Sequence, residues 1–457
     1  MKIALLSCYE LGHQPHGLAM PLAFLERAGH AAVAQDLAIE RLDEDLIRAA
    51  DFVGISVPMH TALRLGVRLA ARVRELHPAV HLCFFGLYAP LNEDYLRALG
   101  ADSVLGGEHE AELVALIDRL SRELPADAPD QRLAAGHSVT LTKLPFPTPQ
   151  RTRLPQLDRY AKLIRDGREH VAGYTETSRG CLHLCRHCPI PPVYGGRFFV
   201  VDARVVLDDI EAQVELGAAH ITFGDPDFFN GPRHGMAIAR ELHRRWPTLT
   251  FDVTVKISHL LKCRAYLPEL ATLGCAFVVS AAESLDDGVL ERLAKHHTRA
   301  DFEQALALTR AAGLVMRPTF VPFTPWTTLE QLAQLVDFIA REGLIDCVDP
   351  VQLSIRLLVP PGSLLLDPDT RGDFGTLDAA ALSYQWRHRD SRVDQLQQQI
   401  AALAADAADR QLAADVVFSQ IRALVHAADG HVATATTATT ARPPGPPAPR
   451  LSEAWFC

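Results

Sequence analysis

The first part of the chain alternates short, nearly continuous apolar runs with longer amphipathic stretches. The apolar runs predict strands at residues 2–7, 31–35, 52–57, 81–85 and 103–105. Helical spacing of apolar residues predicts helices over residues 18–28, 62–76 and 108–120. Strands that are apolar on both faces and are joined by helices are typical of a parallel sheet covered on both sides. Residues 1–120 are therefore predicted to form a doubly wound α/β domain, which binds ligands at the carboxyl ends of its strands.

A second alternating region, residues 174–365, contains six strand–helix repeats. Its strands are predicted at residues 173–177, 220–223, 250–255, 276–281, 316–321 and 351–357. Its helices are predicted at residues 205–216, 233–245, 260–273, 288–295, 302–312 and 329–342. A closed barrel of eight repeats needs about 250 residues. Six repeats in this length indicate a partial (β/α)6 barrel, with active residues where the strands end and the loops begin.

The remaining segments lack this alternation. Residues 121–173 are polar and rich in proline, which predicts a linker or a strap across the barrel. Residues 366–428 form a C-terminal region with a helical pattern from Thr376 onward, rich in Ala, Gln and Leu. Residues 429–457 are largely low-complexity Thr, Ala and Pro and end in a cysteine. Such a composition cannot bury a core, so this segment is predicted to be a flexible tail.

Charge and hydropathy narrow the class of protein. The formal net charge is −10, which gives no general electrostatic reason to bind nucleic acid or an anionic membrane. No uncharged apolar run reaches the roughly 18 residues that span a bilayer. The apolar N-terminal stretch is too short for a secretory signal. We therefore expect a cytoplasmic protein with reduced cysteines and with neither nucleic acid nor a membrane as its partner.

Three of the nine cysteines crowd together directly after the first predicted barrel strand. Cys181, Cys185 and Cys188 have the spacing C-x3-C-x2-C. Soft thiolates at this spacing select zinc or an iron–sulfur cluster. A structural zinc site needs a fourth ligand, which His183 or His187 would supply. Three thiolates around a four-iron cluster instead leave one iron open to a small molecule. The cysteines that stand singly in apolar segments are predicted to be core residues: Cys8, Cys83, Cys263, Cys275 and Cys347.

A C-x3-C-x2-C motif on the first loop of a partial barrel resembles the radical S-adenosylmethionine (SAM) superfamily. The resemblance implies that Cys181, Cys185 and Cys188 bind a four-iron, four-sulfur (4Fe–4S) cluster. It further implies that the open iron binds SAM, which one electron cleaves to methionine and a 5′-deoxyadenosyl radical. The cofactor supplies the difficult chemistry, and the protein supplies binding and orientation. An electron donor such as flavodoxin or ferredoxin is then an implied partner.

The same resemblance points to residues that would contact SAM. Asp225, in the segment after the second barrel strand, matches the position beside the methionine amine, with Asp227 as the alternate. Ser280 and Glu283 end the fourth strand, where ribose or carboxylate contacts are made, and Arg356 on the sixth strand matches an adenine-contacting position. The alternative for the Asp225–Pro226 pair is an ordinary turn.

The first domain resembles the flavodoxin-like cobalamin-binding module of the cobalamin-dependent radical SAM class. Small or hydroxyl residues at strand ends suit a corrin, and we expect this role for Ser56, Gly106 and Gly107. The first loop does not reproduce the D-x-H-x-x-G pattern that supplies an axial histidine in other cobalamin proteins. His13 or His16 is the alternative axial ligand. A first domain that binds no corrin is the alternative for the module as a whole.

The C-terminal region resembles a bacterial radical SAM subgroup with a distinctive tail. The segment 384–388 and the ending at Cys457 carry this likeness. The subgroup ends in Cys, then Cys or selenocysteine, then Ala-Glu-Pro. The likeness implies a sequence truncated at a selenocysteine codon after Cys457, which would be half of a redox pair. The alternative is an incidental terminal cysteine.

These features predict a radical SAM enzyme that acts with cobalamin on a small molecule or peptide. Transfer of a methyl group to carbon is one reaction that enzymes with these cofactors perform, but no motif identifies the substrate. Two alternatives remain open. One is a radical SAM enzyme without cobalamin, and the other is a zinc-stabilised, non-enzymatic binding module.

Overall fold

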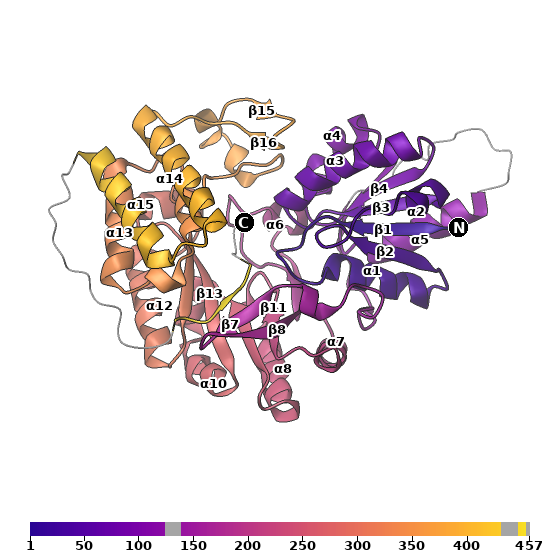
Figure 1. Ribbon diagram of the computed structural model, residues 1–457, viewed down its shortest axis with the longest axis horizontal. Coiled ribbons are helices and arrows are strands. Elements are labelled where there is room, and N and C mark those ends of the chain that lie inside the picture. Colours follow the sequence, from indigo (N-terminus) through magenta and orange to yellow (C-terminus); the bar gives the residue numbers. More distant parts are fainter. Residues whose placement is uncertain (124–138, 431–446, 454–457) are drawn as a thin grey trace.

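The chain folds around two sheets whose helical layers meet along one interface (Figure 1). The computed structural model describes residues 1–123, 139–430 and 447–453. The first sheet and its helices lie on one side, and the second sheet with the C-terminal helices lies on the other. In the described residues, no helix combines the length and the apolar character needed to cross a membrane.

The first sheet is parallel throughout and has the order β2-β1-β3-β4-β5-β6. Its strands are β1 (Ile3–Ser7), β2 (Ala32–Asp36), β3 (Phe52–Ser56), β4 (His81–Phe85), β5 (Ser103–Gly107) and β6 (Val139–Thr140). The order 2-1-3-4-5 is that of the flavodoxin-like doubly wound fold. This topology confirms the predicted fold class, and the connecting segment adds the short edge strand β6.

Helices cover both faces of this sheet. They are α1 (His16–Arg27), α2 (Glu44–Ala49), α3 (His60–Leu76), α4 (Glu93–Ala98) and α5 (Glu110–Glu123). Residues of α1 and α5 share one apolar cluster, which includes Leu22 and Leu113. Residues of α2, α3 and α4 share another, which includes Ile47 and Leu63. The near-continuous apolar strands are explained by these two cores, because each strand is buried on both sides.

The second sheet has the order β14-β13-β12-β11-β8-β7-β17. Its strands are β7 (Lys162–Arg165), β8 (Arg168–Thr175), β11 (His220–Phe223), β12 (Thr250–Thr254), β13 (Cys275–Glu283), β14 (Met316–Phe320) and β17 (Arg450–Leu451). Strands β8, β11, β12, β13 and β14 are parallel to one another, whereas β7 and β17 run antiparallel at the edge. The result is a curled, open sheet that resembles a partial barrel, as predicted.

Helices follow the parallel strands of this sheet. They are α7 (Ala203–Glu215), α8 (Pro232–Arg245), α9 (Ile257–Lys262), α10 (Leu267–Thr272), α11 (Asp287–Arg292), α12 (Arg299–Ala311) and α13 (Leu329–Arg341). The single helix predicted at residues 260–273 is divided into α9 and α10. Pro268 lies in the first turn of α10, where a missing N–H is tolerated and the helix starts afresh.

The predicted sixth strand, residues 351–357, is wrong. Residues Pro350–Ser354 form a 3₁₀ helix instead. Only one parallel bridge, between Phe323 and Arg356, continues the sheet at this position. Pro350 has no N–H to donate to a ladder, and a short apolar run does not by itself distinguish a strand from a buried helical turn.

The C-terminal region is helical only in part. Its helices are α14 (Ser391–Asp409) and α15 (Ala414–Asp429), while residues 377–384 form the short antiparallel pair β15 (Leu377–Asp378) and β16 (Ser383–Tyr384). Residues 450 and 451, expected in a flexible tail, form β17 against β7. The Glu453 carboxylate then accepts a hydrogen bond from the Tyr9 hydroxyl at 2.7 Å. Cys457 lies outside the described residues.

Candidate cluster site and domain interface

The three clustered cysteines lie on one loop at the carboxyl end of the barrel strands. The loop leaves β9 (Ser178–Gly180), which pairs with β10 (Phe198–Val200), and ends at α6 (Ile190–Tyr194). Gly180 has φ +75°, and a Cβ there would lie 2.5 Å from the Arg197 carbonyl oxygen and the Tyr194 ring. Only glycine therefore fits where the chain enters the loop. The cysteines of the described residues form no disulfide.

Positive charge surrounds these thiols. The Lys256 Nζ lies 3.5 Å from the Cys185 Sγ. Burial alone lowers the pKa of Lys295, but the charges of Glu283, Cys185 and Cys188 more than offset this, so the pKa of Lys295 is raised. Burial raises the pKa of the Cys188 thiol to about 12. A metal that binds here must displace protons from the thiols, and the neighbouring lysines favour the resulting negative charge. The donor set and its surroundings therefore fit an anionic thiolate–metal site.

Glu283 connects the end of β13 to the cysteine loop. Its carboxylate Oε1 lies 3.0 Å from the His187 Nε2 and 3.0 Å from the Lys295 Nζ. Although burial raises the pKa of Glu283, Lys295 and His187 hold it far below its usual range. Glu283 has φ +63°, a conformation that costs a non-glycine residue about 1–3 kcal/mol and is concentrated at functional sites.

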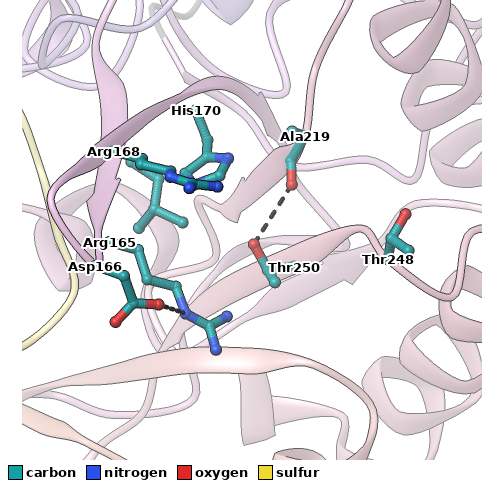
Figure 2. A pocket seen from close by; sticks show the side chains of 8 residues that line it. Arg165, Asp166, Arg168, His170, Ala219, Thr248 and Thr250 are labelled. Atoms are coloured by element: carbon teal, nitrogen blue, oxygen red, sulfur yellow. Dashed lines mark hydrogen bonds and ion pairs between the residues drawn. The ribbon is translucent and has the colours of Figure 1, made fainter.

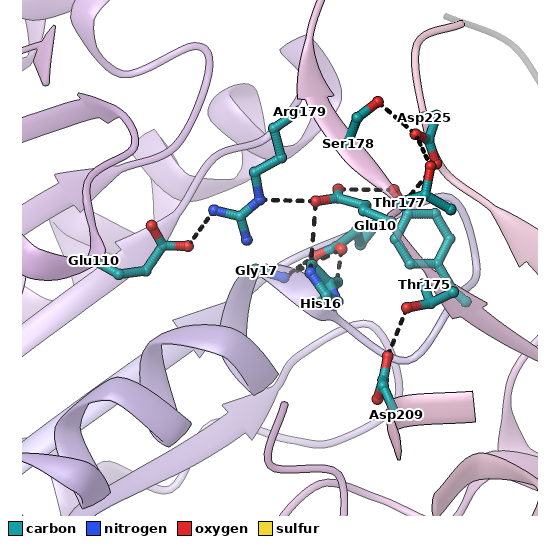
Figure 3. Close-up of polar contacts among 12 residues, drawn as sticks. Glu10, His16, Gly17, Glu110, Thr175, Thr177, Ser178, Arg179, Asp209 and Asp225 are labelled. Atoms are coloured by element: carbon teal, nitrogen blue, oxygen red, sulfur yellow. Dashed lines mark hydrogen bonds and ion pairs between the residues drawn. The ribbon is translucent and has the colours of Figure 1, made fainter. Parts of the chain in front are cut away.

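Asp225 fixes the turn that leads into the loop. Its carboxylate accepts hydrogen bonds from the Thr177 N–H (2.8 Å), the Thr177 hydroxyl (2.7 Å) and the Ser178 hydroxyl (2.6 Å). Figure 3 shows this carboxylate facing Thr177 and Ser178. Asp225 thus lies beside the first barrel loop, and its oxygens accept hydrogen bonds from the protein itself.

Two other residues predicted to contact SAM are also engaged internally. The Ser280 hydroxyl donates to the Val255 carbonyl at 2.6 Å and is fully buried. The Arg356 guanidinium lies 2.6 Å from the Asp394 carboxylate and 3.4 Å from the centre of the Trp386 ring. Arg356 therefore attaches the C-terminal region to the barrel.

Two lysines beside the cysteine thiols, Lys256 and Lys295, were not predicted to be site residues from the sequence. Lys256 follows β12 directly, so the rule that active residues lie at strand ends identifies its position. Lys295 follows α11, and its side chain is only 4% exposed. Burial of Lys295 depends on Glu283, which lies 12 residues away in sequence, and no local pattern reveals that pairing.

In the first domain, the predicted corrin-facing residues are packed against the chain itself. A Cβ at Gly106 would lie 2.4 Å from Pro90, and one at Gly107 would lie 2.3 Å from the Thr140 carbonyl oxygen. A Cβ at Gly17 would lie 2.5 Å from the Ser56 hydroxyl oxygen. A side chain would therefore clash at Gly106 and Gly107, and all three predicted corrin-facing residues are buried.

The loop after β1 meets the barrel in a buried polar network (Figure 3). Arg151, from the connecting segment, is 1% exposed. Its Nε and Nη2 lie 2.8 and 2.9 Å from the two carboxylate oxygens of Asp209. Its Nη2 also donates to the Tyr174 carbonyl at 2.7 Å and lies 3.1 Å from the His16 Nδ1. One buried guanidinium thus joins the connecting segment, the first domain and the barrel.

A second contact joins the cysteine-bearing side of the barrel to the first domain. Arg179 lies two residues before Cys181, and its Nη1 contacts the Glu110 carboxylate at 2.5 Å. The Tyr194 hydroxyl donates to the Glu108 carboxylate at 3.0 Å. Because Glu108 and Glu110 follow β5, the cysteine loop is anchored at the strand ends of the first sheet.

His13 makes this interface sensitive to acid. Burial lowers the pKa of His13 to about 4, from 6.5 in an exposed side chain. Between these values the unfolded chain binds a proton that the folded chain does not, so stability falls as pH drops from 6.5 to 4. At about 1.4 kcal/mol per pKa unit, the effect is about 3 kcal/mol. Between pH 6.5 and 4, the free energy of unfolding of a His13→Gln variant should fall by about 3 kcal/mol less than that of the parent. Urea unfolding at the two pH values measures the difference.

An equal fall in the free energy of unfolding with pH in the parent and in His13→Gln would contradict the role given to His13.

A surface cavity of about 390 Å³ lies at the opposite end of the barrel strands (Figure 2). Arg165, Arg168 and His170 line one side of it, and Thr250 lies at the start of β12. Asp166 pairs with Arg165 at 3.5 Å. Because barrel chemistry takes place at the carboxyl ends of strands, this cavity is separate from the cysteine site.

The barrel region of the chain matches a known protein family. Residues 175–339 match the model of the radical SAM superfamily. The hopanoid C-3 methylase of Methylococcus capsulatus is 24% identical over 323 residues, which are 67% of this chain and 61% of that protein. The tryptophan 2-C-methyltransferase of Streptomyces laurentii is 26% identical over 210 residues, which are 43% of this chain and 34% of that protein.

Two solved structures share the fold. The radical SAM methyltransferase TsrM from Kitasatospora setae, solved with cobalamin and a 4Fe–4S cluster, has a TM-score of 0.58 and 18% identity, covering 75% of this chain and 70% of TsrM. The cobalamin-dependent radical SAM enzyme OxsB, solved with aqua-cobalamin and SAM, has a TM-score of 0.69 and 17% identity, covering 89% of this chain and 66% of OxsB. At 89% of this chain, the likeness to OxsB includes residues of both sheets.

Proposed function

This chain is a member of the radical SAM superfamily, and from that premise we propose that Cys181, Cys185 and Cys188 bind a 4Fe–4S cluster. The observation that carries the proposal is the placement of the three thiols on one loop at the carboxyl end of the barrel strands, beside two buried lysines. Three thiolates leave one iron free for SAM. Membership of the superfamily also favours an enzyme over a zinc-stabilised binding module.

When bound, such a cluster supplies the electron that cleaves SAM to methionine and a 5′-deoxyadenosyl radical. The chain's own residues hold the site in place. Lys256 and Lys295 offset the negative charge of the thiolates. Asp225 fixes the turn before the loop, and Glu283 fixes the loop through His187. Lys256, Lys295, Asp225 and Glu283 are buried, whereas Leu182 and Leu184 of the cysteine loop are 47% and 49% exposed.

Glu283 is the residue we place against SAM. It ends β13, has a strained backbone, and holds both His187 and Lys295 through a single carboxylate oxygen, Oε1. Asp225, Ser280 and Arg356 would then act on SAM through the groups that they position, since their polar atoms are bonded within the protein.

We further propose that the first domain binds cobalamin and that the enzyme transfers a methyl group to carbon in a small molecule. The support is the flavodoxin-like strand order, the likeness in fold to TsrM and OxsB, and the methyltransferase relatives. The close packing at Ser56, Gly106 and Gly107 means that the corrin would contact other residues at these strand ends.

Reconstitution tests both parts of the proposal. The full chain is treated with iron, sulfide and hydroxocobalamin without oxygen and is then desalted. We expect about four irons, four sulfides and one corrin per chain. Four irons without corrin would contradict cobalamin binding alone, whereas negligible iron would contradict the cluster assignment.

A further inference from the structure

A second group of metal-binding side chains lies beside the cysteine loop. We propose that His183, Asp227 and His259 bind one divalent transition-metal ion. His183 lies on the cysteine loop, Asp227 follows β11, and His259 lies in α9 after β12. The site would therefore tie the loop to the ends of two neighbouring barrel strands. We call these three residues the His–Asp–His cluster.

The three donor atoms converge on one point. The Asp227 Oδ2 lies 2.6 Å from the His259 Nδ1 and 3.6 Å from the His183 Nε2. All three atoms lie within 4.8 Å of one another, and the two imidazole ring centres are 4.7 Å apart. Donors at about 2.1 Å from a shared ion lie up to about 4.2 Å from one another. Small side-chain movements would thus bring them to coordination distance.

The three donor atoms face one another without forming well-aligned hydrogen bonds. In the described part of the chain, the Asp227 Oδ2, the His183 Nε2 and the His259 Nδ1 have no hydrogen bond of acceptable geometry. The Asp227 Oδ1 accepts the Phe229 N–H at 3.0 Å, so Oδ2 is the oxygen left over. The side chains of Asp227 and His259 are only 1% and 10% exposed. The buried Asp227 Oδ2 therefore faces only the two imidazole nitrogens, and a cation shared by the three groups would satisfy all of them.

The donor set defines the class of ion. Two imidazoles and one carboxylate suit zinc, iron and similar divalent ions rather than magnesium or calcium. Three protein ligands leave an open position, which is typical of catalytic sites. The cysteines offer only thiolates, so the two sites have different donors. The inference does not rest on the proposed radical chemistry.

Zinc is a suitable probe because it can be counted against iron. The full chain, loaded with its cluster, is incubated with Zn²⁺, desalted, and analysed for zinc and iron. We expect one zinc per chain in the parent and in His170→Gln, whose histidine lines the separate surface cavity. We expect His259→Gln and Asp227→Asn to lose that zinc and to keep the iron of the parent. Asp227→Asn can retain the bond from the Phe229 N–H through its Oδ1.

A second background removes the competing thiols. In a chain carrying Cys181→Ala, Cys185→Ala and Cys188→Ala, one zinc per chain should still bind, and His259→Gln should remove it. Equal zinc in parent and His259→Gln, in either background, would overturn the proposal. Loss of iron together with zinc in His259→Gln would also overturn it, because the histidine would then belong to the cluster. Failure of iron loading in the parent would contradict the proposed function. The zinc measurement in the background without the three cysteines would still test the His–Asp–His cluster.

Discussion

Replacing Cys185 by alanine should remove the iron–sulfur cluster and the formation of 5′-deoxyadenosine together. The Cys185 thiol is buried and lies 3.5 Å from the Lys256 Nζ. No other cysteine lies between Cys181 and Cys188 to replace it. Loss of even an outer partner of a metal ligand costs about 10–100-fold in activity or affinity. We therefore expect loss of a direct ligand to lower SAM cleavage by at least about 100-fold. Iron analysis and chromatography of the nucleoside products measure both effects.

A buried cysteine elsewhere provides the matched control. Cys275 begins β13, at the end of the strand opposite Glu283, and is also buried. Cys275→Ala should retain about four irons per chain and the parent rate of SAM cleavage. A Cys185→Ala variant that keeps the cluster and forms 5′-deoxyadenosine would show that the cluster has different ligands.

Replacing Arg151 by alanine should cost about 3–5 kcal/mol in the free energy of unfolding. Arg151 and Asp209 form an ion pair whose side chains are 0% and 1% exposed. Without the guanidinium, the charged Asp209 would keep only the hydrogen bond from the Thr175 hydroxyl, and the Tyr174 carbonyl would lose one of its two donors. Urea unfolding at pH 7, followed by circular dichroism, measures the change.

Arg153 provides a control two residues away. It pairs with Glu26 at 2.9 Å, but the two side chains are 43% and 47% exposed. Exposed pairs contribute about 0–1 kcal/mol, so Arg153→Ala should change stability by no more than that. A double variant, Arg151→Met with Asp209→Leu, should recover most of the loss, since it removes both charges together. Equal effects of Arg151→Ala and Arg153→Ala would contradict the role given to Arg151.

The periodic parts of the fold could be predicted from sequence. Strands β1 and β3 are buried at every position, so an apolar run without alternation identified them. Helices such as α13 have one apolar face toward the core, which gives a clear helical spacing. The cysteine loop was identifiable because three thiols in eight residues have few structural explanations.

The remaining features depend on contacts between distant segments. β17 exists because residues 450 and 451 pair with residues 163 and 164, and nothing in a Thr/Ala/Pro-rich tail predicts that partner. Arg151 stands in a proline-rich stretch that reads as a linker, yet its position is decided by Asp209. The His–Asp–His cluster joins two loops and helix α9, which are separate in sequence. Such pairings are properties of the fold rather than of any local pattern.

The central claim is that three thiolates hold a cluster whose open iron binds SAM. The most direct measurement is the yield of 5′-deoxyadenosine when the anaerobically reconstituted chain is mixed with SAM and dithionite. The account predicts 5′-deoxyadenosine and methionine in equal amounts, only when the cluster is present and the reductant is added. Protein that carries four irons and sulfides but leaves SAM intact under these conditions would contradict it.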